Sequence, residues 1–142
     1  MSGDAVANKP VPKPTPETQP FWDGCAAGEL RLQHCEDCQH VQYPPRRLCS
    51  GCFSTKVTWR AASGRGTILS WSTVVAPGAP GFEAEVPFLS VIIELAEGPT
   101  MLSVLRNCEA DQVEFDMPVQ VIFEQRSESI FVPYFKPSDI NE

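Results

Sequence analysis

The chain has 142 residues, a formal net charge of −7 and 42% hydrophobic residues. This length fits one full domain or two small ones, and the hydrophobic fraction excludes a wholly disordered acidic chain. No apolar run reaches the ~18 residues of a transmembrane helix, and the N-terminus lacks the basic start and apolar block of an export signal. We therefore expect a cytoplasmic protein without a membrane partner.

The charges are unevenly distributed along the chain. Residues 28–60 carry five basic and three acidic side chains, whereas residues 61–135 carry three basic and ten acidic ones. An acidic surface disfavours nucleic acid, because binding to phosphates requires basic side chains that displace counterions. The uneven distribution predicts two regions with different roles.

The two ends of the chain are predicted to be tails. Pro10, Pro12 and Pro14 lie among small and polar residues. Such a segment buries too little apolar surface to offset the entropy of ordering, so a disordered, proline-rich tail is expected over residues 1–14. A second, short tail is expected over residues 138–142.

An amphipathic helix is predicted over residues 15–28. Thr15 and Pro16 have the character of an N-cap and a first-turn proline, and apolar residues recur after them at helical spacing. The aromatic side chains of Phe21 and Trp22 are our candidates for docking on a partner. The alternative is that both pack against the rest of the same chain.

After Trp59 apolar and polar residues alternate, which is the period of β-strands. Five such stretches separated by turn signals predict a five-stranded barrel of the OB type over residues 61–137, with a small open sandwich as the competing shape. Pro133 cannot donate a ladder hydrogen bond, so the last strand is expected at an edge. The residues expected to share a face within each strand are Leu69, Trp71, Thr73 and Val75; Leu89, Val91, Ile93 and Leu95; Leu102 and Val104; Val119, Val121 and Phe123; and Ile130, Val132 and Tyr134.

Four cysteines carry the strongest signal in the sequence. Cys35 and Cys38 form one C-x2-C pair, and Cys49 and Cys52 form another. Two such knuckles complete a closed tetrahedral thiolate site, which leaves no open position for a reacting water. We therefore predict a structural zinc ion in a ribbon over residues 29–60, although a tetrahedral sulfur site also accepts iron.

Two arginines lie in the loop between the knuckles. Arg46 and Arg47 follow two prolines, so the metal site would hold their loop in place. Two adjacent guanidinium groups can bind a phosphate of coenzyme A or an acidic patch on a partner. An ordinary solvated basic loop is the alternative.

The remaining cysteines and the two histidines give little support to a catalytic site. Cys25 lies on the apolar side of the predicted helix and Cys108 follows a predicted strand, far in sequence from either histidine. His34 and His40 flank the first knuckle, where four thiolates already suffice. A Cys-His nucleophile is therefore poorly supported.

The order of these parts resembles a known family, the acyl-CoA-associated zinc-ribbon/OB-fold proteins. The resemblance covers residues 20–137, nearly the whole chain outside the tails. It rests on FWDG, the stretch GELRLQHCEDCQHVQYPPRRLCSGC, Trp59, the glycines of SGRGTILSWSTV, Pro87 with Phe88, Glu97 with Gly98, and the terminal VPYFKP.

The resemblance implies a mainly β protein with an N-terminal helix, a rubredoxin-like zinc ribbon and a C-terminal OB barrel. Members of the family typically act as small subunits of thiolase-superfamily enzymes, and some are bound to hydratases. They supply no catalytic cysteine but complete the complex and help to shape the acyl-CoA site. Many members have glycine after the second and fourth cysteines, where this chain has Gln39 and Phe53, and proline after the third, where it has Ser50.

We thus expect a zinc-binding accessory subunit, not catalytic alone, of a thiolase-like complex that makes or cleaves a carbon–carbon bond of an acyl-CoA. Two alternatives stay open at this point. One is a free-standing module that binds acyl-CoA or single-stranded nucleic acid, and the other is a rubredoxin-like iron electron carrier.

Overall fold

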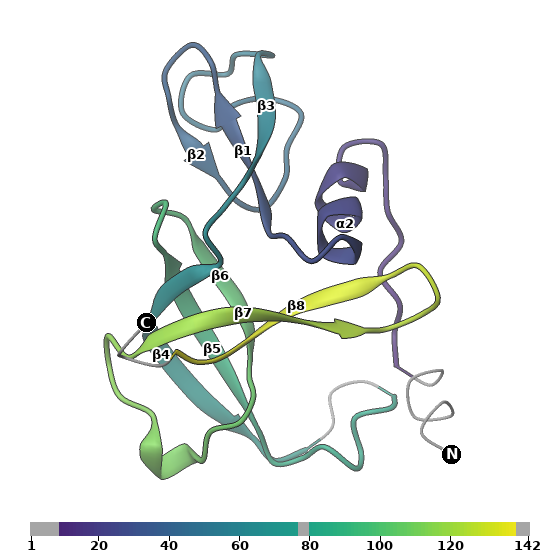
Figure 1. The fold of residues 1–142 in the computed structure, drawn as a ribbon, viewed down its shortest axis with the longest axis vertical. Helices are drawn as coiled ribbons and strands as arrows, with labels where there is room; N and C mark the ends of the chain where they lie inside the picture. The colour runs from purple at the N-terminus through teal and green to yellow at the C-terminus, as the bar shows by residue number, and fades with distance from the viewer. Residues whose placement is uncertain (1–8, 77–79, 139–142) are drawn as a thin grey trace.

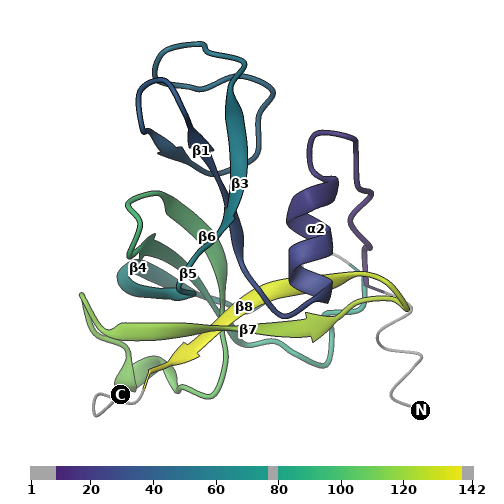
Figure 2. The ribbon, with the colours of Figure 1, turned by 45° about the horizontal axis from the view of Figure 1, so that its top comes forward.

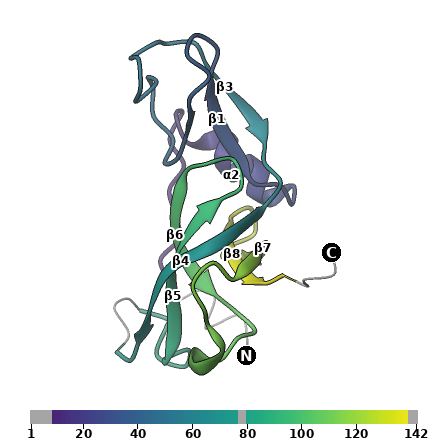
Figure 3. The ribbon, with the colours of Figure 1, turned by 90° about the vertical axis from the view of Figure 1, so that its left-hand side faces the viewer.

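The computed structural model of the protein describes residues 9–76 and 80–138. Residues 1–8 of the expected N-terminal tail lie outside this range, as do residues 139–142 of the C-terminal one. The described chain forms a helix, a three-stranded ribbon and a closed barrel, with the ribbon standing beyond one end of the barrel (Figures 1 and 3). The expected fold class is confirmed.

Helix α2 spans Gln19–Ala26 and is shorter than the expected segment. Thr15 and Thr18 instead form a turn before it, in which the Thr15 backbone nitrogen donates to Thr18 Oγ1 at 2.8 Å. Pro20 lies in the first turn of the helix, where its missing N–H costs nothing. Gly28 follows the helix end with a φ of +82°, a conformation that glycine adopts without strain.

The ribbon contains three short antiparallel strands: β1 (Arg31–Cys35), β2 (Val41–Gln42) and β3 (Val57–Ala61). Their order is β2-β1-β3, and Cys35 pairs with Val57 at one end of the sheet. β1 therefore ends, and β3 begins, at the end of the sheet that carries the cysteine knuckles. This end points away from the barrel (Figure 1).

Five strands close the barrel in the order β4-β5-β6-β8-β7, which confirms the barrel and not the open sandwich. β4 pairs with β5 along most of its length and with β7 near its start, so the sheet has closed on itself. A short 3-10 helix, η1 (Ala110–Gln112), lies in the connection between β6 and β7. The barrel strands are β4 (Arg65–Val74), β5 (Phe88–Leu95), β6 (Thr100–Leu105), β7 (Pro118–Gln125) and β8 (Phe131–Pro137).

The buried face of β4 matches the expected one only in part, since Trp71 packs against the core as expected. Ile68 is buried, whereas Leu69 and Val75 are exposed. The cause is a bulge, because the register with β5 shifts between Ile68 and Ser70. One extra residue in a strand moves the following side chains to the opposite face.

The buried face of β6 is also the opposite of the expected one. Met101 and Leu105 are buried, and Leu102 is 69% exposed. Apolar residues occupy both faces of this strand, so their alternation could not identify the inner one. Ser103 also lies inside, where its hydroxyl donates to the Pro133 carbonyl at 2.9 Å.

The expectation of an edge strand at Pro133 is wrong. β8 lies between β7 and β6. Its backbone ladder to β6 is limited to one registered pair, Leu105 with Phe135. Pro133 has no amide hydrogen to add to this short ladder, and its carbonyl accepts from Ser103 Oγ.

Helix α2 packs between β1 of the ribbon and β8 of the barrel (Figure 2). Phe21 is only 2% exposed and lies 5.5 Å, between ring centroids, from Tyr43. Packing within the same chain is thus the arrangement observed for Phe21, which offers no free surface. Trp22 is half-buried, and its docking role stays a prediction.

Residues 62–64 connect the ribbon to the barrel, and each is bonded to another element. The Ala62 amide donates to the Leu30 carbonyl at 2.6 Å, and the Ser63 amide donates to Glu97 Oε2 at 2.9 Å. The Gly64 carbonyl accepts from the Val121 amide at 2.7 Å.

None of the described helices has the length and apolar character that crossing a bilayer requires.

Gly66 gives a test of the barrel closure. A Cβ at this buried position would lie 2.6 Å from the Glu94 carbonyl oxygen and from Ile93 Cγ2. We expect Gly66→Ala to lower the free energy of unfolding by about 2 kcal/mol, because backbone must move to relieve the overlap. Urea unfolding measures this loss, with Ser70→Ala at an exposed site of the same strand as control. Equal stability of the two variants would contradict the close approach of β4 and β5.

Candidate functional site

The four knuckle cysteines converge at the far end of the ribbon. Their sulfurs all lie within 4.8 Å of one another. The Sγ atoms of Cys35 and Cys52 are 3.6 Å apart, and those of Cys38 and Cys49 are 3.5 Å apart. Tetrahedral ligands at ~2.3 Å from zinc would be ~3.8 Å apart, so the arrangement fits a single ion. The cluster is consistent with structural zinc binding.

The two knuckles share one backbone hydrogen bond and differ in the position of the amide that faces the sulfur. In the first, the Cys38 amide points to Cys35 Sγ at 3.4 Å, and the Gln39 amide donates to the Cys35 carbonyl at 3.0 Å. In the second, the Gly51 amide points to Cys49 Sγ at 3.2 Å, and the Phe53 amide donates to the Cys49 carbonyl at 2.8 Å. These amides favour negative charge on the sulfurs that they face.

The residue after each knuckle has a left-handed backbone conformation. Gln39 has a φ of +67° and Phe53 a φ of +64°. Glycine reaches this region without a steric penalty, which explains its presence here in the family that the sequence resembles. This chain forms the same turns with two larger side chains.

Hydrogen bonding favours deprotonation of Cys35, whereas neighbouring sulfurs and burial raise the pKa values of Cys38 and Cys52. The backbone amide of Cys38, together with that of Asp37, outweighs burial and lowers the pKa of Cys35 to about 7. A thiol with a lowered pKa is more readily deprotonated, and the thiolate is the form that binds metal.

A pair of buried glutamines holds the loop between the knuckles. Gln33 Oε1 accepts from the Arg46 amide at 2.8 Å and from Gln42 Nε2 at 2.8 Å, and Gln33 Nε2 donates to the Arg46 carbonyl at 2.8 Å. Gln42 also donates to the Leu48 carbonyl and accepts from the Ser50 amide. The sequence gives no sign of this network, because nothing in the pattern of the strands marks a glutamine as buried.

Arg46 and Arg47 are both exposed beside a shallow pocket of about 290 Å³ that Trp59 also lines. Gln33 fixes the backbone of Arg46, and both arginine side chains are exposed to solvent. Arg47 Nε lies 3.8 Å from Glu17 Oε1, a distance that makes only a weak exposed ion pair. Their role as contacts for phosphate or for a partner stays a prediction.

The two histidines lie outside the sulfur cluster. His40 is exposed, and its Nε2 lies 3.0 Å from Ser50 Oγ. His34 lies in β1, with its backbone carbonyl facing the hydroxyl of Thr58 on β3. Of the described residues, only the four cysteines form a group with metal-ligand geometry.

The other two cysteines lie in environments that suppress thiolate formation. Cys25 is 1% exposed, and burial raises its pKa to about 12. Burial, together with the charges of Glu109 and Asp111, also raises the pKa of Cys108. Cys108 lines a cavity of about 240 Å³ at the barrel end, so it is the more accessible of the two.

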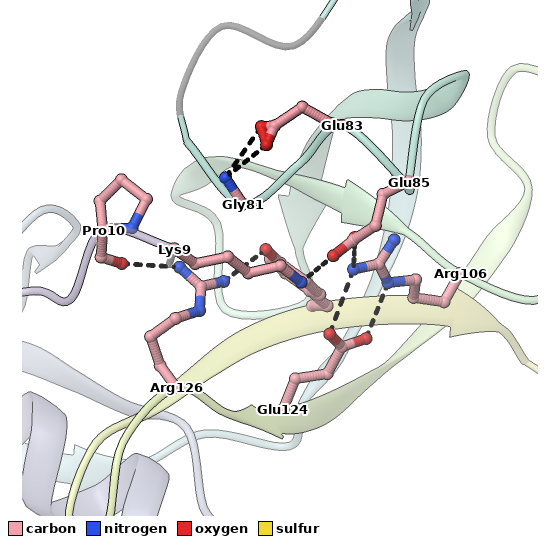
Figure 4. Close-up of polar contacts among 9 residues, drawn as sticks. Lys9, Pro10, Gly81, Glu83, Glu85, Arg106, Glu124 and Arg126 are labelled. Atoms are coloured by element: carbon pink, nitrogen blue, oxygen red, sulfur yellow. Dashed lines mark hydrogen bonds and ion pairs between the residues drawn. The ribbon is translucent and has the colours of Figure 1, made fainter. Parts of the chain in front are cut away.

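An ionic cluster that no sequence pattern indicates lies beside this cavity, which Arg106 and Glu85 of the cluster also line (Figure 4). Arg106, directly after β6, binds both carboxylate oxygens of Glu124 on β7, at 2.7 and 3.1 Å, and Glu85 at 2.6 Å. The pairing of Lys9 with Glu85 ties the N-terminal segment to the same cluster.

Arg126 adds a second tie to the N-terminal segment. Its guanidinium is buried and donates to the Pro10 carbonyl at 3.0 Å and to the Tyr134 hydroxyl at 2.7 Å. Desolvation by burial, followed by the charges of Arg126 and Arg106, lowers the pKa of Lys9. Residues 9–14 thus begin in contact with the barrel and form no helix or strand. The expected disorder stays a prediction for residues 1–8.

Comparison with known proteins identifies both parts of the chain. Residues 22–58 match the family described as ChsH2, rubredoxin-like zinc ribbon domain, and residues 59–124 match ChsH2, C-terminal OB-fold domain. The solved structure of an Ltp2-ChsH2(DUF35) aldolase superimposes with a TM-score of 0.79 at 25% identity. The match covers 89% of this chain and 98% of that one.

Two curated relatives extend the comparison. The 3-oxo-4,17-pregnadiene-20-carboxyl-CoA hydratase alpha subunit of Mycobacterium tuberculosis is 36% identical over 112 residues, or 79% of this chain and 35% of that protein. The chain therefore matches little more than a third of that relative. A DUF35 domain-containing scaffold protein of Methanocaldococcus jannaschii is 32% identical over 96 residues, or 66% of this chain and 67% of that protein.

The cysteine cluster predicts one tightly held zinc ion per chain. We expect Cys49→Ser to lose the metal and unfold the ribbon, because three thiolates and a hydroxyl replace a closed thiolate site. Elemental analysis and the fluorescence of Trp59 on β3 measure the two effects. Cys108→Ser, outside the cluster, is the control and should keep its zinc. Full zinc occupancy in Cys49→Ser would exclude Cys49 as a ligand.

The raised pKa values of Cys25 and Cys108 predict slow alkylation of the zinc-loaded protein. Each thiol holds its proton to a higher pH than a free cysteine, so fewer thiolates are present at pH 8, and labelling should accelerate as the pH rises. We expect iodoacetamide to modify Cys108 first and Cys25 only after unfolding, as mass spectrometry of peptides can show. Rapid labelling of Cys25 in the native state would contradict its burial.

Proposed function

The chain belongs to the ChsH2 family of zinc-ribbon and OB-fold proteins, and on this premise we propose that it is an accessory subunit of an enzyme complex acting on an acyl-CoA. The main support is the match to the Ltp2-ChsH2(DUF35) aldolase, because it includes helix, ribbon and barrel together and covers 98% of that chain. The name of that aldolase joins two components, Ltp2 and ChsH2. The curated hydratase relative is an alpha subunit, and the archaeal relative is a scaffold protein.

We infer that the reaction takes place on the partner. A closed four-thiolate site leaves zinc no open position for water. The two remaining cysteines have raised pKa values and so are poor nucleophiles. We assign Cys35, Cys38, Cys49 and Cys52 as zinc ligands with a structural role in a ribbon over residues 29–60, and we place the protein in the cytoplasm.

We propose a thiolase-superfamily enzyme as the partner, and the formation or cleavage of a carbon–carbon bond as the reaction. This finer assignment is supported by the resemblance of the sequence and by the similarity to a structure that is described as an aldolase. A hydratase subunit is the second candidate, since the Mycobacterium tuberculosis relative carries that name. The acyl-CoA would lie at or near the shared interface, with Arg46 and Arg47 as candidate phosphate contacts.

Other functions receive less support. The barrel region carries ten acidic and three basic side chains, a balance that repels nucleic-acid phosphates. An iron electron carrier would have the same sulfur geometry, but the family that matches the ribbon is described as a zinc ribbon domain. A colourless protein without a visible absorption band would exclude iron.

Co-expression tests the proposal. The chain should co-purify in a defined stoichiometry with a thiolase-like or hydratase subunit encoded beside it, and the pair should turn over an acyl-CoA thioester. We expect this chain alone to show no turnover and the enzyme subunit alone to show reduced activity or solubility. The control is Cys49→Ser, whose unfolded ribbon should reduce complex formation. An enzyme subunit that is fully active and soluble alone, with no stable complex, would contradict an accessory role.

A further inference from the structure

Phe53 is exposed in a backbone conformation that disfavours it. It directly follows the fourth cysteine, has a φ of +64° and is 75% exposed. A bulky residue in the left-handed region is a true outlier, and a large exposed aromatic ring is unfavourable in water. Strained residues of this kind cluster at functional sites.

The Phe53 ring is mostly exposed and forms no aromatic pair within the described residues. The knuckle itself does not require an aromatic residue. Gln39 has the same place and conformation in the first knuckle, and its polar side chain donates back to the Glu36 carbonyl at 3.2 Å.

The surroundings of Phe53 combine an apolar residue with charges of both signs, including the exposed Asp37, whose carboxylate accepts from Ser54 Oγ at 2.6 Å. Leu48 is 41% exposed and, with Arg47 and Thr55, lines a surface hollow of about 500 Å³ beside the second knuckle. The side chain of Arg47 is largely free, and Lys56 is also exposed. This end of the ribbon points away from the barrel, so the barrel does not cover it (Figures 1 and 3).

We propose that Phe53 and Leu48 form the anchor by which the ribbon docks on the enzyme subunit, in an apolar pocket of that subunit rimmed by acidic side chains. The inference rests on the proposed function and deepens it by assigning the surface that meets the partner. The exposed basic groups Arg47 and Lys56 select an acidic rim by charge complementarity. Burial of the ring in the complex recovers the apolar surface that the free chain exposes.

The test uses full-length chains and the enzyme subunit recovered by co-expression. Phe53→Gly and Phe53→Ala both remove the ring, but only glycine also relieves the strained φ. Gln39→Gly is the matched control, since it relieves the same strain in the other knuckle and leaves the anchor intact. The measurements are the Kd for the enzyme subunit, the Tm of the free chain and the zinc content.

We expect both Phe53 variants to bind the enzyme subunit at least about tenfold more weakly, as for a central aromatic contact. Gln39→Gly should bind as the wild type does. The Tm of the free chain should rise in the two glycine variants by on the order of 2 °C and should not rise in Phe53→Ala. Full zinc content in every variant shows that the ribbon has folded.

The outcomes separate this inference from the proposed function. If the wild-type chain binds the enzyme subunit and both Phe53 variants bind it equally well, the anchor assignment is wrong and the accessory function stands. If binding falls equally in Gln39→Gly, the effect belongs to the knuckle backbone and the assignment is also wrong. If the wild-type chain binds no enzyme subunit, or binds only a second copy of itself, the proposed function fails and the anchor fails with it.

Discussion

The convergence of four cysteine sulfurs at one end of the ribbon is the constraint on which the ribbon and helix α2 depend. The ribbon has only three short strands, too few to build a core of their own. Bonds from one ion to two turns replace that core, since metal binding free energy becomes folding free energy. The fixed ribbon in turn places Leu30 and Leu32 in the common core with Phe21 of the helix. The helix, which is too short to be stable alone, thus has two surfaces to pack against.

Features with a local cause could be predicted from the sequence. The doubled C-x2-C spacing identifies the metal site because a turn of that length brings two sulfurs together whatever surrounds it. Strand alternation likewise identified a five-stranded barrel, since the period of side chains is a property of each strand alone. The buried faces of β4 and β6 could not be predicted in the same way. They depend on the bulge at Leu69 and on which of two apolar faces of β6 the neighbouring strands cover.

Features that arise from closure of the chain left no signal in the sequence. Arg126 and Pro10 are separated by 116 positions, and only the completed barrel brings them together. Pro133 suggested an edge because an edge is the usual solution for a missing amide. Here the backbone ladder between β6 and β8 is short, and the Ser103 hydroxyl joins the two strands by donating to the Pro133 carbonyl. Arg106, directly after β6, instead binds Glu124 on β7. The metal ligands were therefore predictable, whereas the contacts that complete the barrel were not.

The connection between ribbon and barrel has a mechanical consequence. Residues 62–64 each bond to a different part of the structure, through Leu30, Glu97 and Val121. These bonds restrain the segment, and helix α2 contacts both β1 and β8, so we expect the ribbon to keep a fixed orientation relative to the barrel. A protein that binds the cysteine end of the ribbon would therefore also fix the orientation of the barrel. Contact at the ribbon would thus orient the distant surface of the barrel without any conformational change in the connecting residues.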